Sequence, residues 1–449
     1  MRALTKALAL ASFLLPLAIP AAETAGLDDR AAAYREFRTA FDAADYKIAL
    51  PLASRVVEIT RSEFGAEAPE MGNALSNLAT TYYRMKEYGL ALDTYRSALT
   101  VLDLTGDATD PRLVRPLQGM GTTLLAMDRQ LEALAPLKRA VDIVRNRDGL
   151  HNASQLPVLR SLIAAYVATD RFEDAGREQE YAVTVAEAAF GKEDLRMLPV
   201  LDEQARWFER TGRYTAARIV HARAVQLADA AKPNGVEAVP GLRGIARCFR
   251  LGFIYGEANE SIATAAGELQ GMGSPAVAHA LTLPTTEGER ALRVALARLG
   301  SAPERAGTRG AVLVDLGDWY FTADKATRAM ETWREAWREL STAGDTRLLD
   351  QPVAVVYLPP AIATSRRMRE SDDYTSETVR VRMVIAADGD VREATVANPV
   401  SEHESAERSV MAAARRANWR PAFRNGQPIT VSDYLFSEEI FVKRPKNSD

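Results

Sequence analysis

The stretch that decides the fold is Leu78-Ala79-Thr80-Thr81-Tyr82-Tyr83-Arg84, followed by Ala91-Leu92-Asp93-Thr94-Tyr95-Arg96-Ser97-Ala98. In both parts the apolar residues recur every three or four positions, which is the spacing of an amphipathic helix. Two such stripes joined by a short polar segment predict a pair of packed helices. Alanine stands where the helices must cross closely, and a tyrosine fills the space beside it.

This pattern recurs every 42 residues through the first half of the chain. Three columns carry the signal: Ala91, Ala133, Ala175 and Ala217; Ala98, Ala140, Ala182 and Ala224; and Tyr82, Leu124, Tyr166 and Phe208. Three glycines fall on the same grid after the second helix, where a glycine can take the left-handed conformation that closes a helix: Gly65, Gly149 and Gly191. Columns that keep one register are the signature of a repeat architecture. They predict five units over residues 31–230.

The repeats resemble the tetratricopeptide repeat family, in the 42-residue form found in kinesin light chains. The best single copy comes later, at Leu316-Gly317-Asp318-Trp319-Tyr320 with Ala329, Trp333 and Ala336. It stands 112 residues beyond Gln204, which is not a multiple of 42. We therefore expect residues 231–309 to hold helices with degenerate repeats and residues 310–343 to hold one further unit.

The resemblance implies an all-α superhelical solenoid whose first helices line a concave groove for an extended peptide or a partner helix. Projection of those helices predicts the groove residues, which are Tyr34, Arg38, Ser76, Thr80, Tyr83, Arg84, Gln118, Thr122, Arg160, Asp202 and Arg206. Arginine, tyrosine and small polar residues suit recognition of an acidic peptide. The alternative interpretation is that these side chains are only the solvated face of the solenoid.

The spacing changes after about residue 345. Val379 to Ile385 alternates as a half-buried strand, and Asp388-Gly389 supplies residues that tolerate the positive φ of a hairpin turn. A second strand runs through Val391 and Val396, helical spacing returns over residues 403–418, and a last strand is expected over residues 429–442. The predicted order is strand, strand, helix, strand (β-β-α-β), in a small α+β domain.

This order, together with Trp419-Arg420-Pro421-Ala422 and Asn425-Gly426-Gln427-Pro428, resembles the carboxy-terminal domain of the TonB family over residues 352–443. The resemblance implies an edge strand that pairs with a short peptide of an outer-membrane receptor. The edge residues are expected to be Ile429, Val431, Tyr434 and Phe436. Tyr357-Leu358-Pro359-Pro360 departs from the Tyr-Pro pair of the family, and the repeat body leaves no place for the long proline-rich span of TonB itself.

The amino terminus predicts secretion. Arg2 and Lys6 precede an apolar run from Ala7 to Ile19, and small residues follow it, so residues 1–22 are expected to be a cleaved signal peptide. An uncleaved membrane anchor is the alternative. Cys248 is the single cysteine, which excludes an internal disulfide bond and favours a large domain in the bacterial periplasm.

No catalytic, cofactor-binding or metal-binding motif is found. The four histidines lie in no metal-ligand spacing, and the net charge of -4 argues against a nucleic-acid partner. We expect His221 to be a packing residue and Cys248 a buried thiol, and we expect no integral membrane segment after signal cleavage. The sequence thus predicts a non-enzymatic periplasmic adaptor without cofactors that binds protein or peptide partners, such as outer-membrane receptors or envelope proteins. The alternative is a component of TonB-type energised transport across the outer membrane.

Overall fold

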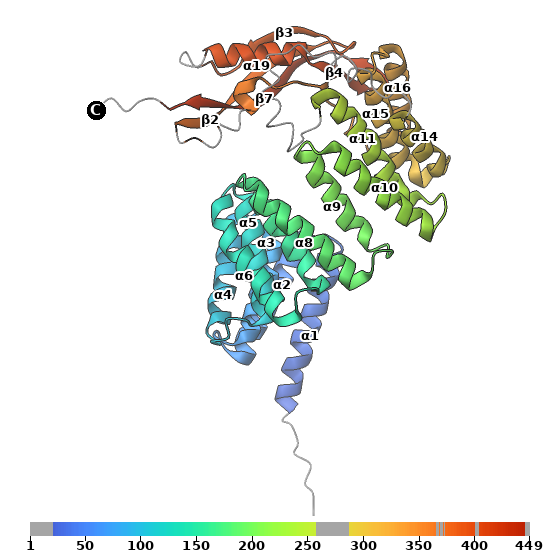
Figure 1. Cartoon of the computed structure of the whole chain (residues 1–449). Helices are drawn as coiled ribbons and strands as arrows, with labels where there is room; N and C mark the ends of the chain where they lie inside the picture. The colour runs from blue at the N-terminus through green and yellow to red at the C-terminus, as the bar shows by residue number, and fades with distance from the viewer. Residues whose placement is uncertain are drawn as a thin grey trace, which may run out of the picture. The chain divides into compact units, whose positions relative to one another are not determined.

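Helix pairs occupy most of the chain in this computed structural model, which describes residues 21–256, 287–364, 368, 371, 373–399 and 404–444 (Figure 1). The helices of the repeat region are α1 (Ala21–Asp42), α2 (Tyr46–Phe64), α3 (Pro69–Arg84), α4 (Tyr88–Asp103), α5 (Val114–Ala126), α6 (Gln130–Asp148), α7 (Leu156–Ala168), α8 (Phe172–Phe190), α9 (Met197–Arg210), α10 (Tyr214–Ala231), α11 (Val239–Tyr255), α14 (Glu287–Leu299), α15 (Ala306–Thr322) and α16 (Ala326–Thr342). The described residues form two compact units, divided between Ala189 and Phe190. The predicted helical solenoid followed by a small α+β domain is confirmed.

The alanine columns lie at the helix crossings. Ala79, Ala91 and Ala98 have no solvent-exposed surface, and Tyr95 packs beside them. The turn between the two helices of a unit uses one residue with positive φ, and these residues also recur every 42 positions, as Ala44, Lys86, Asp128, Asp170 and Gly212. The fixed turn sets the crossing of each pair, and the small residues allow the close approach.

The glycines that follow the second helices have positive φ, as predicted, but a different backbone state. Gly65, Gly149 and Gly191 have φ of 86° to 89°. At Gly65 and Gly149 ψ is 166°, which is an extended conformation and not the left-handed helical one. That region is essentially restricted to glycine because any Cβ would clash with the backbone. The grid therefore selects glycine for a reason other than the one inferred.

The repeat continues further than the sequence pattern suggests. Helix α11 begins 42 residues after α9, and α14 packs against it as the second helix of the pair. The break in spacing thus falls inside one helix pair, between Gly256 and Glu287, where residues 257–286 lie outside the described part. The domain boundaries assigned from the sequence remain a prediction, as does the signal segment, of which only Ala21 and Ala22 are described.

The carboxy-terminal module is built from short sheets and one long helix. Its elements are β1 (Val353–Val356), α17 (Ala361–Thr364), β2 (Tyr374–Ile385), β3 (Val391–Val396), α19 (Glu404–Arg416), β4 (Asn418–Arg420), β5 (Ala422–Arg424), β6 (Gln427–Ile429) and β7 (Val431–Lys443). Strands β3, β2 and β7 form an antiparallel sheet in that order, β1 pairs with β4, and β5 pairs with β6. Helix α19 covers one face, where Val410 and Ala414 pack on Val381 and Ile440.

Candidate binding surfaces

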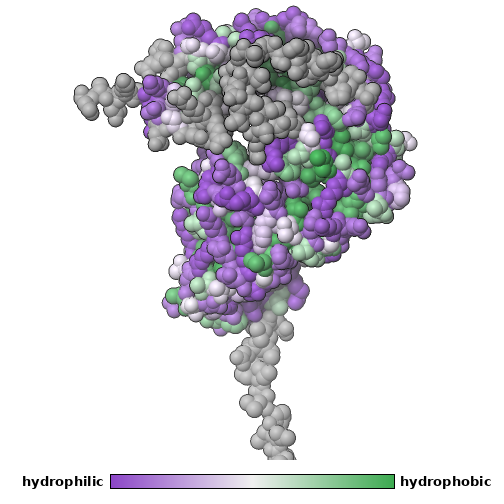
Figure 2. Space-filling model, viewed as in Figure 1, coloured by the Kyte–Doolittle hydropathy of each residue, from purple (hydrophilic) through white to green (hydrophobic). Residues whose placement is uncertain are grey.

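The best-formed cavity in the described residues lies in the amino-terminal unit, on helices α1, α2, α3 and α5. Its volume is about 530 Å³. The lining residues are Arg30, Ala31, Tyr34, Val56, Thr60, Glu70, Asn73, Ala74, Asn77 and Arg115. Most come from the first helices of three successive pairs, so the cavity belongs to the predicted groove. The visible face of this unit is mostly hydrophilic (Figure 2).

Three polar side chains in the cavity are not engaged by the protein. Within the described residues, the side chains of Asn73, Asn77 and Arg115 make no hydrogen bond and no ion pair. Asn77 is nevertheless only 7% exposed. Arg30 differs, because its guanidinium lies 3.0 Å from Glu63 and stacks on the Phe64 ring at 4.8 Å. A buried amide and a free guanidinium in one cavity are available for a ligand, because polar groups without partners are costly to bury.

The predicted groove residues fall into different surroundings. Tyr34 lines the cavity. Ser76, one repeat later, is 2% exposed and donates its hydroxyl to the Gly72 carbonyl at 2.7 Å, so it does not face the groove. Gln118, the next in this column, donates to the Pro157 carbonyl at 2.9 Å and thereby ties α5 to α7. The column is not equivalent along the stack, because each pair is rotated against the last.

The remaining predicted positions in this unit are partly committed to internal contacts. Thr80 hydroxyl lies 2.9 Å from the Tyr95 hydroxyl, and Thr122 donates to the Gly119 carbonyl at 3.0 Å. The Tyr83 ring packs on Tyr88, with centroids 5.7 Å apart. Three others are exposed, namely Arg38, Arg84 and Arg160.

Sequence inspection missed five cavity residues: Arg30, Glu70, Asn73, Asn77 and Arg115. A signal for them was present, since Ala31, Asn73 and Arg115 form a column spaced by 42 residues. This column lies three positions before the one chosen, which is nearly one helical turn. The phase of a helix relative to the superhelix axis decides which column faces inward, and a single sequence does not give that phase.

Charged residues on the first helices of the carboxy-terminal unit are paired with one another. Asp202 and Arg206 are 2.8 Å apart on α9. Arg243 of α11 is 2.6 Å from Asp315 of α15. Arg247 of α11 bonds to Glu209, the last member of this series. These groups satisfy each other, in contrast to the cavity of the amino-terminal unit.

Glu209, His221 and Cys248 converge from α9, α10 and α11, and form the one group of possible metal ligands found among the described residues. His221 Nε2 lies 2.9 Å from Glu209 Oε1, and Cys248 Sγ donates to the same oxygen at 3.4 Å. Arg247 donates to both oxygens, at 2.8 and 2.9 Å. A ring fits here only because Gly244 has no side chain, since a Cβ there would lie 2.2 Å from the imidazole.

The donor set of this cluster suits an internal ion pair better than a cation. Burial alone would raise the pKa of Glu209, but hydrogen bonds from His221 and Arg247 outweigh it and hold the pKa at about 2. Burial beside that carboxylate raises the pKa of the Cys248 thiol, so the thiolate that a metal or an electrophile requires is disfavoured. The guanidinium of Arg247 would also repel a bound cation. His221 and Cys248 are buried, as expected from their positions in the repeat.

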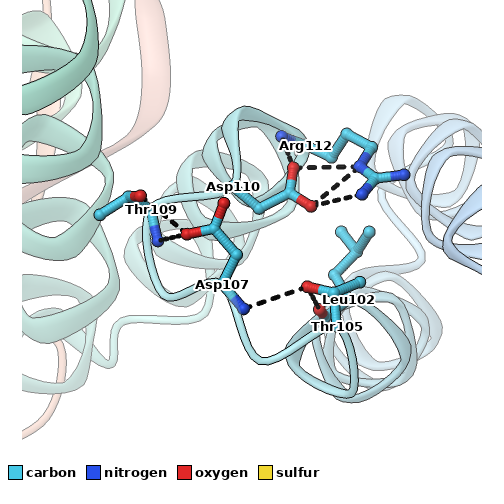
Figure 3. Close-up of polar contacts among 6 residues, drawn as sticks. All are labelled: Leu102, Thr105, Asp107, Thr109, Asp110 and Arg112. Atoms are coloured by element: carbon cyan, nitrogen blue, oxygen red, sulfur yellow. Dashed lines mark hydrogen bonds and ion pairs between the residues drawn. The ribbon is translucent and has the colours of Figure 1, made fainter.

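The loops that lead into some units share an Asp-x-Arg clasp (Figure 3). Asp110 accepts the Arg112 backbone N–H at 2.8 Å and the Arg112 guanidinium at 2.6 to 3.0 Å, while Asp107 receives Thr109. The hydrogen bonds from Arg112 lower the pKa of Asp110. The same clasp recurs as Asp194 with Arg196 and as Asp345 with Arg347. It holds the entrance of a helix in a structural role.

The predicted edge strand is β7, which pairs with β2 and has no second strand partner among the described residues. Val379 of β2 lies opposite Glu438, whereas the Arg380 carbonyl turns to β3 and accepts the Ala397 N–H at 2.8 Å. Because bonding alternates along antiparallel strands, the backbone groups of Leu435 and Ser437 point away from β2. These groups form the open edge.

The predicted edge residues are divided between two elements. Ile429 belongs to β6 and lies opposite Ala422, because the chain breaks after it before β7 begins at Val431. Tyr434 and Phe436 lie in β7, but their rings pack against Trp419, at 5.5 and 5.7 Å between centroids. Their side chains thus support the strand from within the core, and its backbone forms the edge.

Two family models match this chain. The tetratricopeptide repeat model matches residues 38–103 and 70–146, within the helix pairs that line the cavity. The model described as Gram-negative bacterial TonB protein C-terminal matches residues 375–435. The chain carries tetratricopeptide repeats and a TonB carboxy-terminal domain. Tetratricopeptide repeats are protein-interaction modules, and this terminal domain is typical of Gram-negative envelope proteins.

Several solved structures are similar over part of the chain. A putative kinesin light chain of Podosopora anserina with nearly identical TPR-like repeats has 18% identity over 47% of this chain and 97% of its own, with a TM-score of 0.41. Aspartyl phosphate phosphatase F of Bacillus subtilis has 13% identity over 73% and 74%, with a TM-score of 0.41. The C-terminal part of a TPR repeat-containing protein of Cytophaga hutchinsonii has 13% identity over 70% and 97%, with a TM-score of 0.40. A search of curated proteins found no match.

The helices were also compared with the length and hydropathy that a bilayer demands. Among the described residues, none is both long and apolar enough to span a membrane.

Proposed function

We propose that this protein is a non-enzymatic adaptor of the bacterial periplasm that binds a peptide segment of a partner in the cavity of α1, α3 and α5. The observation that carries the proposal is the set of unengaged polar groups there, namely Asn73, Asn77 and Arg115. Each carboxamide offers a donor and an acceptor, so each can pair with one peptide unit of an extended chain. The guanidinium of Arg115 suits a carboxylate of that chain.

The polar lining also restricts what can bind. Glu70 stands in the same cavity and disfavours a second acidic group near its carboxylate. Tyr34, which is 39% exposed, offers a ring face to an apolar side chain of the peptide. We therefore expect a short segment with one acidic residue and one apolar residue to bind better than a uniformly acidic one.

The open edge of β7 is proposed as a second binding surface, for an extended segment of another envelope protein. An added strand would satisfy the outward backbone groups of Leu435 and Ser437, and its side chains would give specificity. Main-chain pairing of this kind requires an extended guest segment without proline at the paired positions.

Charge reversal at Arg115 tests the groove. A photo-crosslinking residue placed at Asn73, an exposed position on α3, should capture a partner in intact cells, and Arg115→Glu should reduce that capture at least about tenfold. The matched control is Lys47→Glu, which reverses one exposed charge on α2 away from the cavity. Equal capture by the Arg115→Glu and Lys47→Glu proteins would show that the cavity is not the binding site.

Energised transport is the second candidate, because residues 375–435 match the TonB terminal domain. The two candidates differ at the amino terminus. A mature chain that begins near Ala22 and is released with the soluble periplasmic fraction supports the adaptor. Retention in the inner membrane with an intact amino terminus would favour transport.

A further inference from the structure

The last helix pair of a repeat stack needs a cover for the face that would pack on the next pair. In this chain that pair is α15 and α16, and its core holds Trp319 and Trp333, which are 1% and 0% exposed. The β5–β6 hairpin of the carboxy-terminal module lies on it. Phe423 belongs to the same apolar cluster, with its ring centroid 6.5 Å from that of Trp333. Gly426, at φ +73°, brings the hairpin turn so close to Trp337 that a Cβ would lie 3.2 Å from the ring.

A buried ion pair joins the two parts at the centre of this contact. Arg420 of β4 donates to both carboxylate oxygens of Asp318 on α15, at 2.7 and 2.9 Å. Trp333 Nε1 donates to the same carboxylate at 3.1 Å. The side chains of Asp318 and Arg420 are 10% and 5% exposed. Removing two charges from water is costly, so each group requires the other and no other described group replaces it.

The chain between the two parts strengthens the contact. Arg420 also donates to the Leu348 carbonyl at 3.0 Å, and the Phe423 N–H donates to the Leu349 carbonyl at 2.7 Å. The Leu349 side chain is fully buried in the cluster of the stack. On another side, Arg250 of α11 donates to the Val355 carbonyl of β1 at 3.1 Å. Contacts with α11, α15, the connecting segment and β1 thus hold one module in one position.

We propose that the carboxy-terminal module caps the repeat stack by docking its β4–β6 surface on α15 and α16, with Asp318 and Arg420 as the specific pair. The module takes the place of the helix pair that would come next. Its Trp-Arg-Pro segment serves this internal contact, so Arg420 and Phe423 are not available to an outside partner. The edge of β7 is held at a fixed place relative to α11 and α15, and does not swing on a tether.

Nicking the full chain tests the cap directly. A protease recognition sequence inserted between Ala343 and Gly344, both exposed after α16, allows the connection to be cut in the folded protein. The two fragments of the cut chain should co-elute in gel filtration at submicromolar concentration. Separate elution of two folded fragments, judged by circular dichroism, would overturn the proposal.

Substitution in the cut protein tests the ion pair. Arg420→Gln leaves Asp318 buried without its partner, and should raise the dissociation constant of the fragments by about 30-fold or more. The control is Arg298→Gln, which removes another buried arginine, paired with Asp229 at 2.6 Å inside the stack and away from the docked surface. It should change the dissociation constant less than about twofold. Equal effects of Arg420→Gln and Arg298→Gln would refute the assigned role of the pair, and the co-elution of the unsubstituted fragments tests the cap even if either variant fails to fold.

Discussion

Replacing Glu209 with glutamine tests the buried cluster of α9, α10 and α11. The carboxylate accepts from Arg247, His221 and Cys248 at once. A carboxamide has the same shape, but one of its two atoms is a donor. Glu209→Gln therefore sets a donor against donors and leaves the charge of Arg247 without a partner.

The size of the effect follows from two observations. Removing one member of a buried ion pair costs about 3–5 kcal/mol when both groups are buried. The Glu209 side chain is 11% exposed but Arg247 is 36% exposed, so water replaces part of the loss. The pKa of Glu209, lowered from 4.5 to about 2, corresponds to at most about 3 kcal/mol at about 1.4 kcal/mol per unit. We expect the free energy of unfolding at pH 7 to fall by about 2–3 kcal/mol.

The same cluster predicts a pH dependence with a definite sign. The pKa of Glu209 is lower in the folded chain, so its ionisation stabilises the fold fully above pH 4.5, and this contribution is lost as the pH falls towards 2. The glutamine variant has no such group. The stability difference between the two proteins should therefore shrink steadily between pH 4.5 and 2.

Urea unfolding followed by far-ultraviolet circular dichroism measures both effects, at pH 7 and at pH 2.5. The control is Glu331→Gln, an exposed glutamate of α16, which should change the free energy of unfolding by less than about 0.5 kcal/mol. The reasoning is refuted if Glu209→Gln is as stable as the wild-type chain at pH 7. It is also refuted if the difference at pH 2.5 equals the difference at pH 7.

Three further outcomes are expected. Gly121→Val places a Cβ 2.4 Å from the Leu137 side chain, so the pair α5–α6 must open, and urea unfolding should show a loss of about 1–3 kcal/mol; an unchanged midpoint would contradict the close crossing. Asp110→Ala removes the clasp on Arg112 and should lower the free energy of unfolding by about 1–2 kcal/mol in the same assay; no change would mean that the clasp is not stabilising. Because burial raises the pKa of Cys248, iodoacetamide at pH 8 should label the native chain at least about 100-fold more slowly than the urea-unfolded chain, by mass spectrometry. Rapid native labelling would refute the buried position.

Matched substitutions distinguish these effects from general sensitivity. Gly89→Ala meets no atom within 4 Å, so it should leave the free energy of unfolding nearly unchanged or raise it. Asp93→Ala removes an exposed aspartate that pairs only with its helix neighbour Arg96 at 3.3 Å, and a loss below about 0.5 kcal/mol is expected.

The groove shows where sequence and structure part. The presence of a groove could be predicted, since helix pairs with small residues at their crossings must stack. Its lining could not, because Ser76 and Asn73 lie less than one turn apart and both are polar. Rotation of α3 against its neighbours buries Ser76 and leaves Asn73 exposed. That rotation is set by packing between pairs, which no single pair encodes.

By itself the sequence determined the local units, because these depend on neighbours in the chain. Helices follow from apolar spacing, and the turn at Asp388-Gly389 and the strands beside it follow from residue type and alternation. Tertiary structure alone decided what the charged residues do. Asp318 and Arg420 are 102 residues apart and each looks like an ordinary surface residue in its own segment. Only folding removes both from water, and in a buried site each charge is stable only beside the other.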